Sequence, residues 1–209
     1  MSCIAERVRV LRNAERMLGF GARRGTVCTI TGLSLKEIQQ LVPRKEARAG
    51  RWPSSIDWYH TANLAKRVEA SLFAVHYWRN RRNEFEIVES LIDAYGRYLS
   101  CVGSQPSISF DRAVNLVCHL EGNVWGVGDR SFDIAVCPQC KSQQLIQVGY
   151  ERLIGGCIFC KFVQRYVADA RLQAHFPTRS MPEDAGQTLW TTDGTQDAET
   201  RANVESPQK

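Results

Sequence analysis

The sequence predicts a mostly α-helical protein that carries one small module organised by four cysteines. Apolar residues recur at helical spacing through most of residues 4–120. Two C-x2-C pairs follow, separated by sixteen residues, and beyond His175 the composition turns to Pro, Thr, Asp, Gly, Gln and Glu. We therefore expect a helical domain over residues 1–136, a four-cysteine module over 137–176 and a disordered acidic tail over 177–209.

Four stretches have the apolar periodicity of amphipathic helices. In residues 4–18, Ile4, Val8, Leu11 and Leu18 recur at helical spacing, with arginines largely elsewhere on the cylinder. The same spacing predicts helices over residues 61–80, 84–99 and 110–120, the last with Ser109 as its N-terminal cap.

Residues 22–42 have the outline of a helix-turn-helix unit. Ser34 and Glu37 form a capping box, so a short helix is expected to begin at Leu35. A turn at Thr31-Gly32-Leu33 connects this helix to a helical or turn segment around Arg24 to Ile30. Such turns also occur in α proteins that bind no nucleic acid, and the β-branched residues of the first segment weaken a helical interpretation. The basic residues around the unit favour a nucleic-acid-binding interpretation slightly.

Three aromatic residues follow this unit in residues 50–60. Trp52, Trp58 and Tyr59 surround Pro53, which forces an extended backbone before it. Aromatic rings can stack on nucleic-acid bases, but the more frequent role of such residues is to anchor a connecting segment to a core. We expect a buried anchor here.

The cysteines Cys137, Cys140, Cys157 and Cys160 have the spacing of a tetrahedral zinc site. A lone C-x-x-C pair would suggest a redox site, but two pairs at this spacing favour zinc, and nothing in the chain indicates the oxidising compartment that disulfides need. Four thiolates fill the coordination sphere of the ion, so we expect one structural Zn²⁺ in a zinc-ribbon-like module. Two short strands are expected between the pairs, and a strand or short helix after Cys160.

The charge distribution suggests a polyanionic partner. The whole chain has a net charge of +5, with 11 Lys or Arg against 4 Asp or Glu in residues 1–52 and 3 against 6 in residues 177–209. A modest positive charge is also common in proteins that bind nothing acidic. No run of 18 apolar residues and no apolar signal-peptide core is present, which favours a cytoplasmic protein without a membrane role. Phosphate-cradling, nucleophile-elbow and H-E-x-x-H motifs are missing, so we do not expect an enzyme.

The order of these parts resembles the FlhC family of flagellar transcriptional regulators. The resemblance rests on the segments LGFGARRGTVCTITGLS, LVPRKEARAGRWPSSIDWYHT, ASLFAVHYWR and IDAYGRYL, and on the position of the cysteine pairs. It covers about residues 4–172 and does not include the tail. The resemblance implies zinc on the four cysteines, and it implies a hetero-oligomer with a second subunit, FlhD, that binds promoter double-stranded DNA and activates flagellar operons. The apolar faces of the helices between 61 and 120 offer surfaces for that subunit, and RNA polymerase is an expected further partner.

We expect basic side chains to hold the promoter through its phosphates, and polar side chains of residues 34–42 to read base edges. The candidate DNA-binding residues are Arg23, Arg24, Lys36, Gln39, Gln40, Arg44, Lys45, Arg48, Lys141, Arg152, Lys161 and Arg165. The alternative function is a zinc-ribbon adaptor or an RNA-binding module, which a preference for single-stranded RNA over duplex promoter DNA would reveal.

Overall fold

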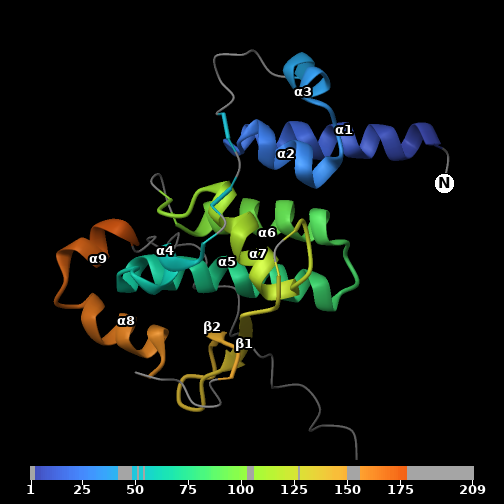
Figure 1. Cartoon of the computed structure of the whole chain (residues 1–209). Coiled ribbons are helices and arrows are strands. Elements are labelled where there is room, and N and C mark those ends of the chain that lie inside the picture. The colour runs from blue at the N-terminus through green and yellow to red at the C-terminus, as the bar shows by residue number, and fades with distance from the viewer. Residues whose placement is uncertain are drawn as a thin grey trace, which may run out of the picture. The chain divides into compact units, whose positions relative to one another are not determined.

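Helices make up most of the part of the chain that the structure describes (Figure 1). The computed structural model describes residues 3–41, 49–50, 52–53, 55–102, 106–126, 128–149 and 156–177. The mostly α fold class predicted from the sequence is confirmed. In chain order the elements are α1 Cys3–Gly19, α2 Arg24–Thr31, α3 Leu35–Leu41, α4 Asp57–His60, α5 Leu64–Arg82, α6 Ile87–Cys101, α7 Phe110–Glu121, β1 Phe132–Val136, β2 Gln143–Gln147, α8 Ile158–Tyr166 and α9 Ala170–His175.

The helices predicted from apolar periodicity are present, with ends that differ by a few residues. The predicted range 4–18 corresponds to α1, and the predicted ranges 61–80, 84–99 and 110–120 correspond to α5, α6 and α7. Ser109 caps α7 as expected, because its side chain accepts a hydrogen bond from the backbone N–H of Arg112.

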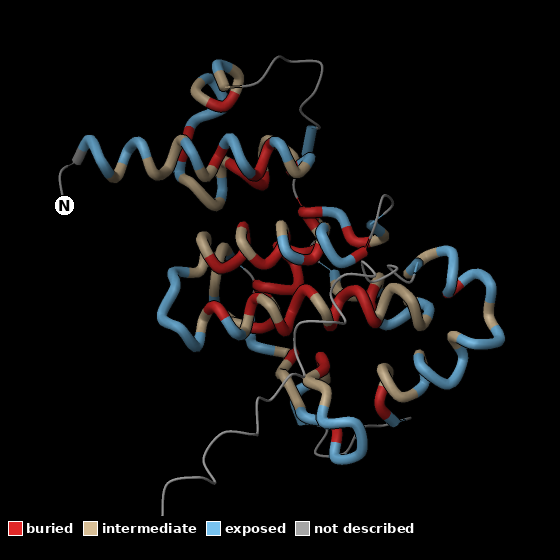
Figure 2. Tube along the Cα trace, turned by 180° about the vertical axis from the view of Figure 1, so that it is seen from behind, coloured by how far each residue is buried: buried red, intermediate tan, exposed pale blue. Residues whose placement is uncertain are grey.

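The core lies among α5, α6 and α7, where the buried residues concentrate (Figure 2). Large aromatic side chains fill it: the Tyr95 ring contacts the rings of Phe73, Tyr98 and Phe110, and all four residues are at most 2% exposed. The apolar faces of the helices between residues 61 and 120 therefore pack against one another in the core. The expectation that these faces remain available to a partner is therefore wrong for most of their length.

Exposed apolar side chains occur elsewhere, and two of them lie on the first helix. Ile4 and Val8 of α1 are 76% and 40% exposed, and both lie on the N-terminal half of that helix. The other half of α1 is anchored, because Ala14, Met17 and Leu18 are buried and α1 contacts both α2 and α6. The first helix thus presents an apolar surface of its own at one end.

The segment between α3 and α5 is anchored by its aromatic residues, as the sequence predicts. Trp52 is 5% exposed and Tyr59 is 8% exposed. The indole Nε1 of Trp58 donates to Asn115 Oδ1 at 2.8 Å, and the Asn115 side chain in turn donates to the carbonyl of Pro53 at 2.9 Å. These bonds fix the connecting segment to α7. Because Trp52 and Tyr59 are buried, their rings are not available for stacking on bases.

The two strands form an antiparallel hairpin, but at a different place from the one expected. Phe132 pairs with Gln147 and Val136 with Gln143, so the hairpin surrounds the first C-x2-C pair. The prediction of two strands between the cysteine pairs is wrong for the described part of that segment, which contains β2 alone. The physical reason is that β1 needs a buried partner surface, and Phe132, fully buried, provides it against Tyr59 and His119.

The described residues all belong to one compact unit, Met1–Pro177. The predicted division of this unit at residues 136 and 137 stays a prediction. The tail beyond Pro177 lies outside the described residues, as do four candidate DNA-binding residues, Arg44, Lys45, Arg48 and Arg152. Among the described residues, no helix is both long and apolar enough to cross a membrane.

Candidate metal centre and nucleic-acid interface

The four predicted ligand cysteines converge from two turns. Cys137 directly follows β1 and Cys140 closes the turn that leads to β2, while Cys157 immediately precedes α8 and Cys160 lies in its first turn. Their Sγ atoms all lie within 4.8 Å of one another. Because the second pair sits at the start of a helix, its two side chains face the same point on the hairpin.

The distances between the sulfur atoms fit a tetrahedral ion. Cys137 Sγ lies 3.9 Å from Cys160 Sγ, and Cys140 Sγ lies 3.7 Å from Cys157 Sγ. Four sulfurs at about 2.3 Å from a zinc ion stand about 3.8 Å apart at the vertices of a tetrahedron. The four cysteines can therefore hold a metal ion without rearrangement of the backbone.

Backbone hydrogen bonds shape each turn around the sulfurs. Lys141 N donates to Cys137 O at 3.0 Å and Cys137 N donates to Ser142 O at 2.9 Å, which closes the first turn with Lys141 at a positive φ of 60°. In the second turn, Lys161 N donates to Cys157 O at 3.1 Å. Backbone hydrogen bonds thus define the shape of both turns.

The thiols differ in their readiness to ionise. Hydrogen bonds from the side chain and backbone of Ser142 lower the pKa of Cys140 to about 6, which favours its thiolate. The adjacent thiol of Cys140, together with burial and the other cysteines, raises the pKa of Cys160 to about 12. Several thiolates in one place repel each other, and a bound dication would relieve that repulsion.

One buried polar contact attaches this module to the helical core, and a second joins two elements of the module itself. The backbone N–H of Leu145 in β2 donates to Ser71 Oγ of α5 at 3.1 Å, and Ser71 is fully buried. The side chain of Gln144 accepts from Ile158 N at 3.0 Å, which joins β2 to the start of α8. Neither residue was singled out from the sequence, since nothing local indicates that a serine in a helix or a glutamine in a strand is buried.

The predicted helix-turn-helix unit is also present. Helix α2 ends at Gly32, whose φ of 71° allows the sharp turn into α3. The capping box is formed, because Ser34 N donates to Glu37 Oε2 at 2.8 Å and Glu37 N donates to Ser34 Oγ at 3.4 Å. The β-branched residues of α2 do not prevent the helix, since Val27 and Thr26 are buried in it.

Asp111 of α7 fixes the start of this unit. Its Oδ1 accepts from the Thr26 hydroxyl at 2.6 Å and from the backbone N–H of Arg23 at 3.2 Å, and Arg23 Nε lies 3.4 Å from Oδ2. The aspartate side chain, only 5% exposed, lies at the N-terminus of α2, where a negative charge is favourable. Sequence reasoning missed this residue because an aspartate in the first turn of a helix ordinarily faces solvent.

The family comparison agrees with the arrangement of these parts. A family model described as flagellar transcriptional activator (FlhC) matches residues 1–173. The chain belongs to the FlhC family. Among curated individual proteins, none matches the chain. The FlhC match ends before the tail, in agreement with the extent of the resemblance seen in the sequence.

The candidate DNA-binding residues of this FlhC chain fall into two groups. On the α2–α3 unit, Lys36 and Gln40 are exposed and Gln39 is half-buried, while Ile38 is fully buried on the opposite side of α3. Lys141, Lys161 and Arg165 are exposed around the cysteine module. Helices α5 to α7 lie between the two groups (Figure 1), so the structure does not bring them together.

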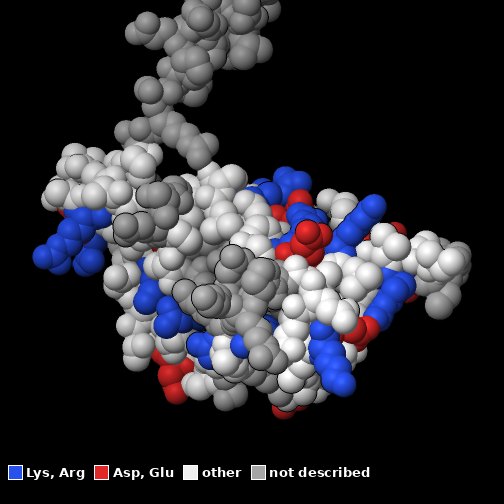
Figure 3. All heavy atoms as spheres, turned by 90° about the horizontal axis from the view of Figure 1, so that it is seen from above, with Lys and Arg blue, Asp and Glu red and all other residues white. Residues whose placement is uncertain are grey.

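The candidate DNA-binding residues near the α2–α3 unit differ in whether they form an ion pair. Arg23 is held by Asp111, whereas Arg24 and Lys36 make no ion pair with any described residue. Seen from the side of α1 to α3, basic groups stand at separate places among acidic and neutral ones (Figure 3). One acidic residue of this side, Glu37, pairs with Arg7 of α1 and so joins α3 to the first helix.

Proposed function

We propose that this chain is the DNA-binding subunit of a transcriptional activator that acts with FlhD at promoters of flagellar operons in the cytoplasm. The observation that carries the proposal is the α2–α3 unit: a helix-turn-helix held rigidly by Asp111, with Lys36 and Gln40 exposed on its second helix. In such units the second helix lies in the major groove, where its exposed side chains contact base edges. Membership of the flagellar transcriptional activator family supports the same function.

The metal in this proposal is a single structural Zn²⁺ on Cys137, Cys140, Cys157 and Cys160. Four thiolates complete a tetrahedral shell, so no open position is left for an activated water. When bound, the ion holds the two turns together. Hydrogen bonds within the chain attach the hairpin to its neighbours: Gln144 connects it to α8 and Ser71 connects it to α5.

The proposed contact with FlhD involves α1. Its exposed end carries Ile4 and Val8, and their removal from water by a partner's surface would favour association. The interior faces of α5, α6 and α7 are excluded by burial. Recruitment of RNA polymerase would then be a protein–protein contact of the assembled complex.

The experiment that tests the proposal is a gel shift on a flagellar promoter duplex, with the full chain alone and with FlhD, at two salt concentrations. We expect binding that strengthens with FlhD and weakens at the higher salt, because phosphate contacts release counterions. Equal binding of the promoter and of random duplex by both preparations would contradict the proposal. A preference for single-stranded RNA would favour the RNA-binding alternative.

A further inference from the structure

One ion pair joins the exposed end of α1 to the helix that is proposed to enter the major groove. Arg7 of α1 pairs with Oε1 of Glu37 in α3. Among the described residues, this is the only hydrogen bond or ion pair that a side chain of α3 makes with any other helix or strand. Both views of the chain show α3 beside α1 (Figures 1 and 2), so the pair is a direct polar connection between them.

The carboxylate of this pair also caps α3. Oε2 of Glu37 accepts from Ser34 N at 2.8 Å and from the Ser34 hydroxyl at 2.7 Å. The two oxygens of Glu37 are therefore divided between the start of its own helix and Arg7. A displacement of Arg7 consequently acts on the first turn of α3, which carries the exposed side chain of Lys36.

Helix α3 depends on surrounding contacts for its position. It has only seven residues, and a helix of this length is not stable in water by itself. Its inner side is held by Ile38, which is fully buried, and its last residue, Leu41, is half-buried. Apolar burial is non-directional, whereas a charged hydrogen bond has a preferred geometry. The pair at Glu37 therefore orients the helix that Ile38 anchors.

Arg7 lies where the exposed end of α1 meets its anchored part. Ile4 and Val8, the two large apolar side chains exposed on this helix, stand three residues before Arg7 and one residue after it. The first N–H groups of a helix have no partner within it, so its end is prone to fray. Just beyond, Arg9 anchors α1 to α6 by pairing with Glu89 at 3.2 Å. A surface that covers Ile4 and Val8 would hold the turn that carries Arg7 in helical form.

We propose that Arg7 is a positioning residue for α3, and that FlhD strengthens promoter binding through it. This inference rests on the proposed function. FlhD bound over Ile4 and Val8 keeps the end of α1 helical. Arg7 then holds Glu37, and α3 presents its exposed side chains to the major groove in one orientation. Because a larger fraction of the chain is then competent to bind, the apparent affinity for the promoter rises by the same factor.

The size of the effect follows from the exposure of the pair. The side chain of Arg7 is 51% exposed and that of Glu37 is 34% exposed. Ion pairs exposed to this degree contribute modestly, because water and salt screen them. We therefore expect loss of the pair to lower the promoter preference of the complex with FlhD by about two- to fivefold, without abolishing it.

A double-mutant cycle tests the proposal with the full, metal-loaded chain in complex with FlhD. R7A removes the arginine, and E37Q removes the charge while it keeps an acceptor for the capping box. Fluorescence anisotropy measures the affinity for a flagellar promoter duplex and for a shuffled duplex. The ratio of the two affinities is compared, because a uniform loss of phosphate attraction cancels in it. We expect the ratio to fall about two- to fivefold in R7A, to recover in R7K, and to be no lower in R7A/E37Q than in R7A.

The matched control is R12A, which removes an exposed arginine of the same helix that forms no ion pair with a described residue. The promoter preference of R12A is expected to equal that of the wild type. Circular dichroism and thermal melting establish that each variant is folded. A ratio in R7A equal to that in R12A, or additive losses in R7A and E37Q, would overturn the proposal.

Hydrogen exchange without DNA separates this inference from the proposed function. In the wild type, addition of FlhD is expected to raise the protection of the amides of Ile38 to Leu41 in α3 as well as those of α1. In R7A, only the amides of α1 should respond. If the α3 amides of the wild type do not respond to FlhD, the coupling through Arg7 is wrong even where the promoter is bound. Absence of promoter preference in the wild-type complex would overturn the proposed function, while the exchange measurement still decides whether Arg7 connects α1 to α3.

Discussion

Replacement of Asp111 by alanine tests how the helix-turn-helix unit is held on the core. The variant D111A removes the acceptor that α7 places at the N-terminus of α2. The Thr26 hydroxyl, in a fully buried residue, then has no partner, and the N–H of Arg23 loses its acceptor. Because Arg23 is 43% exposed, water replaces its lost ion pair at little cost.

The expected loss of stability follows from these contacts. A hydrogen bond to a charged acceptor contributes about 1.5–3 kcal/mol, and the ion pair to the exposed arginine less than about 1 kcal/mol. Since the start of α2 can rehydrate partly, we expect D111A to lower the free energy of unfolding by about 3 kcal/mol. For a protein of this size that corresponds to a fall in Tm of roughly 6–12 °C. D111N keeps one acceptor oxygen and is expected to lose less.

Urea unfolding of D111A, D111N and the wild type measures the effect, with D57A as the matched control. Asp57 also lies in the first turn of a helix, but it is exposed and accepts no hydrogen bond through its side chain among the described residues. Its replacement is expected to change stability by at most about 0.5 kcal/mol. Hydrogen exchange should show that the amides of α2 lose protection in D111A. If D111A is no less stable than D57A, the anchoring of α2 by Asp111 is refuted.

Three further predictions concern the metal module and its attachment. C157S removes one of four thiolates and is expected to weaken metal binding by about 10²–10³-fold, a quarter of the roughly 10–16 kcal/mol of a structural zinc site. C101S, which alters an exposed cysteine outside the cluster, is expected to keep the zinc affinity of the wild type. An unchanged zinc affinity of C157S, measured by competition with a chelator, would contradict the assignment. Treatment with a strong chelator is expected to lower the thermal midpoint, and Zn²⁺ but not Mg²⁺ should restore it, because thiolates select soft ions; a midpoint insensitive to chelation would count against a structural ion. S71A leaves the N–H of Leu145 without its acceptor and is expected to lower the free energy of unfolding in urea by about 1–3 kcal/mol. S100A, at an exposed serine of α6, is expected to be nearly neutral. Equal stability of the two variants would show that β2 does not depend on this bond.

Local patterns predicted the helices and the cysteine cluster well. The apolar periodicity of residues 4–18 and the Ser34–Glu37 capping box are properties of neighbouring residues, so they appear in the sequence as they do in α1 and α3. The C-x2-C spacing places the two sulfur atoms of each pair close together, because each pair lies on one tight turn. The alternation of Phe132, Ile134 and Val136 was a usable signal for β1, although the sequence analysis placed both strands after Cys140.

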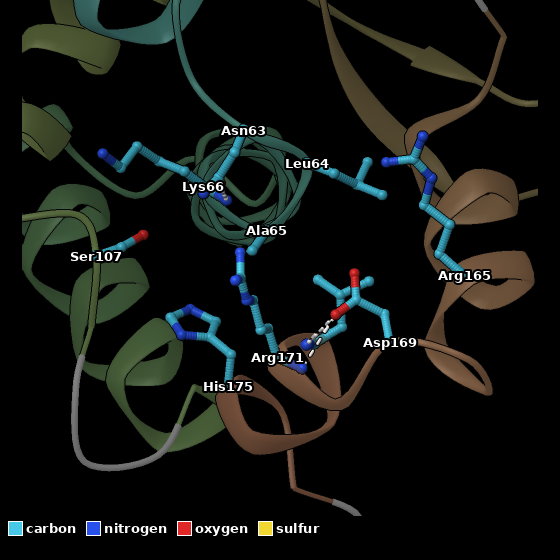
Figure 4. Close-up of a pocket in the computed structure, with 10 residues that line it drawn as sticks. Asn63, Leu64, Ala65, Lys66, Ser107, Arg165, Asp169, Arg171 and His175 are labelled. Atoms are coloured by element: carbon cyan, nitrogen blue, oxygen red, sulfur yellow. Dashed lines mark hydrogen bonds between the residues drawn. The ribbon is translucent and has the colours of Figure 1, made fainter.

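The remaining features depend on contacts between distant segments. Asp111, Ser71 and Glu69 are polar residues whose burial depends on partners 29 to 106 positions away in the chain, such as Tyr98 and His175 for Glu69. No neighbouring residue indicates such a partner. The cavity between the start of α5 and α9 likewise combines segments that lie far apart in the sequence (Figure 4).

Discrimination between promoter and shuffled DNA by the complex with FlhD decides whether this chain is a subunit of a sequence-specific activator. Fluorescence anisotropy at one salt concentration measures the affinity for a flagellar promoter duplex and for a shuffled duplex of equal length. We expect the wild type to prefer the promoter by about 10³-fold or more, and K36A/Q40A to lose most of that preference while it retains the weaker binding to shuffled DNA. Equal affinity of the wild-type complex for both duplexes would contradict the proposed promoter recognition.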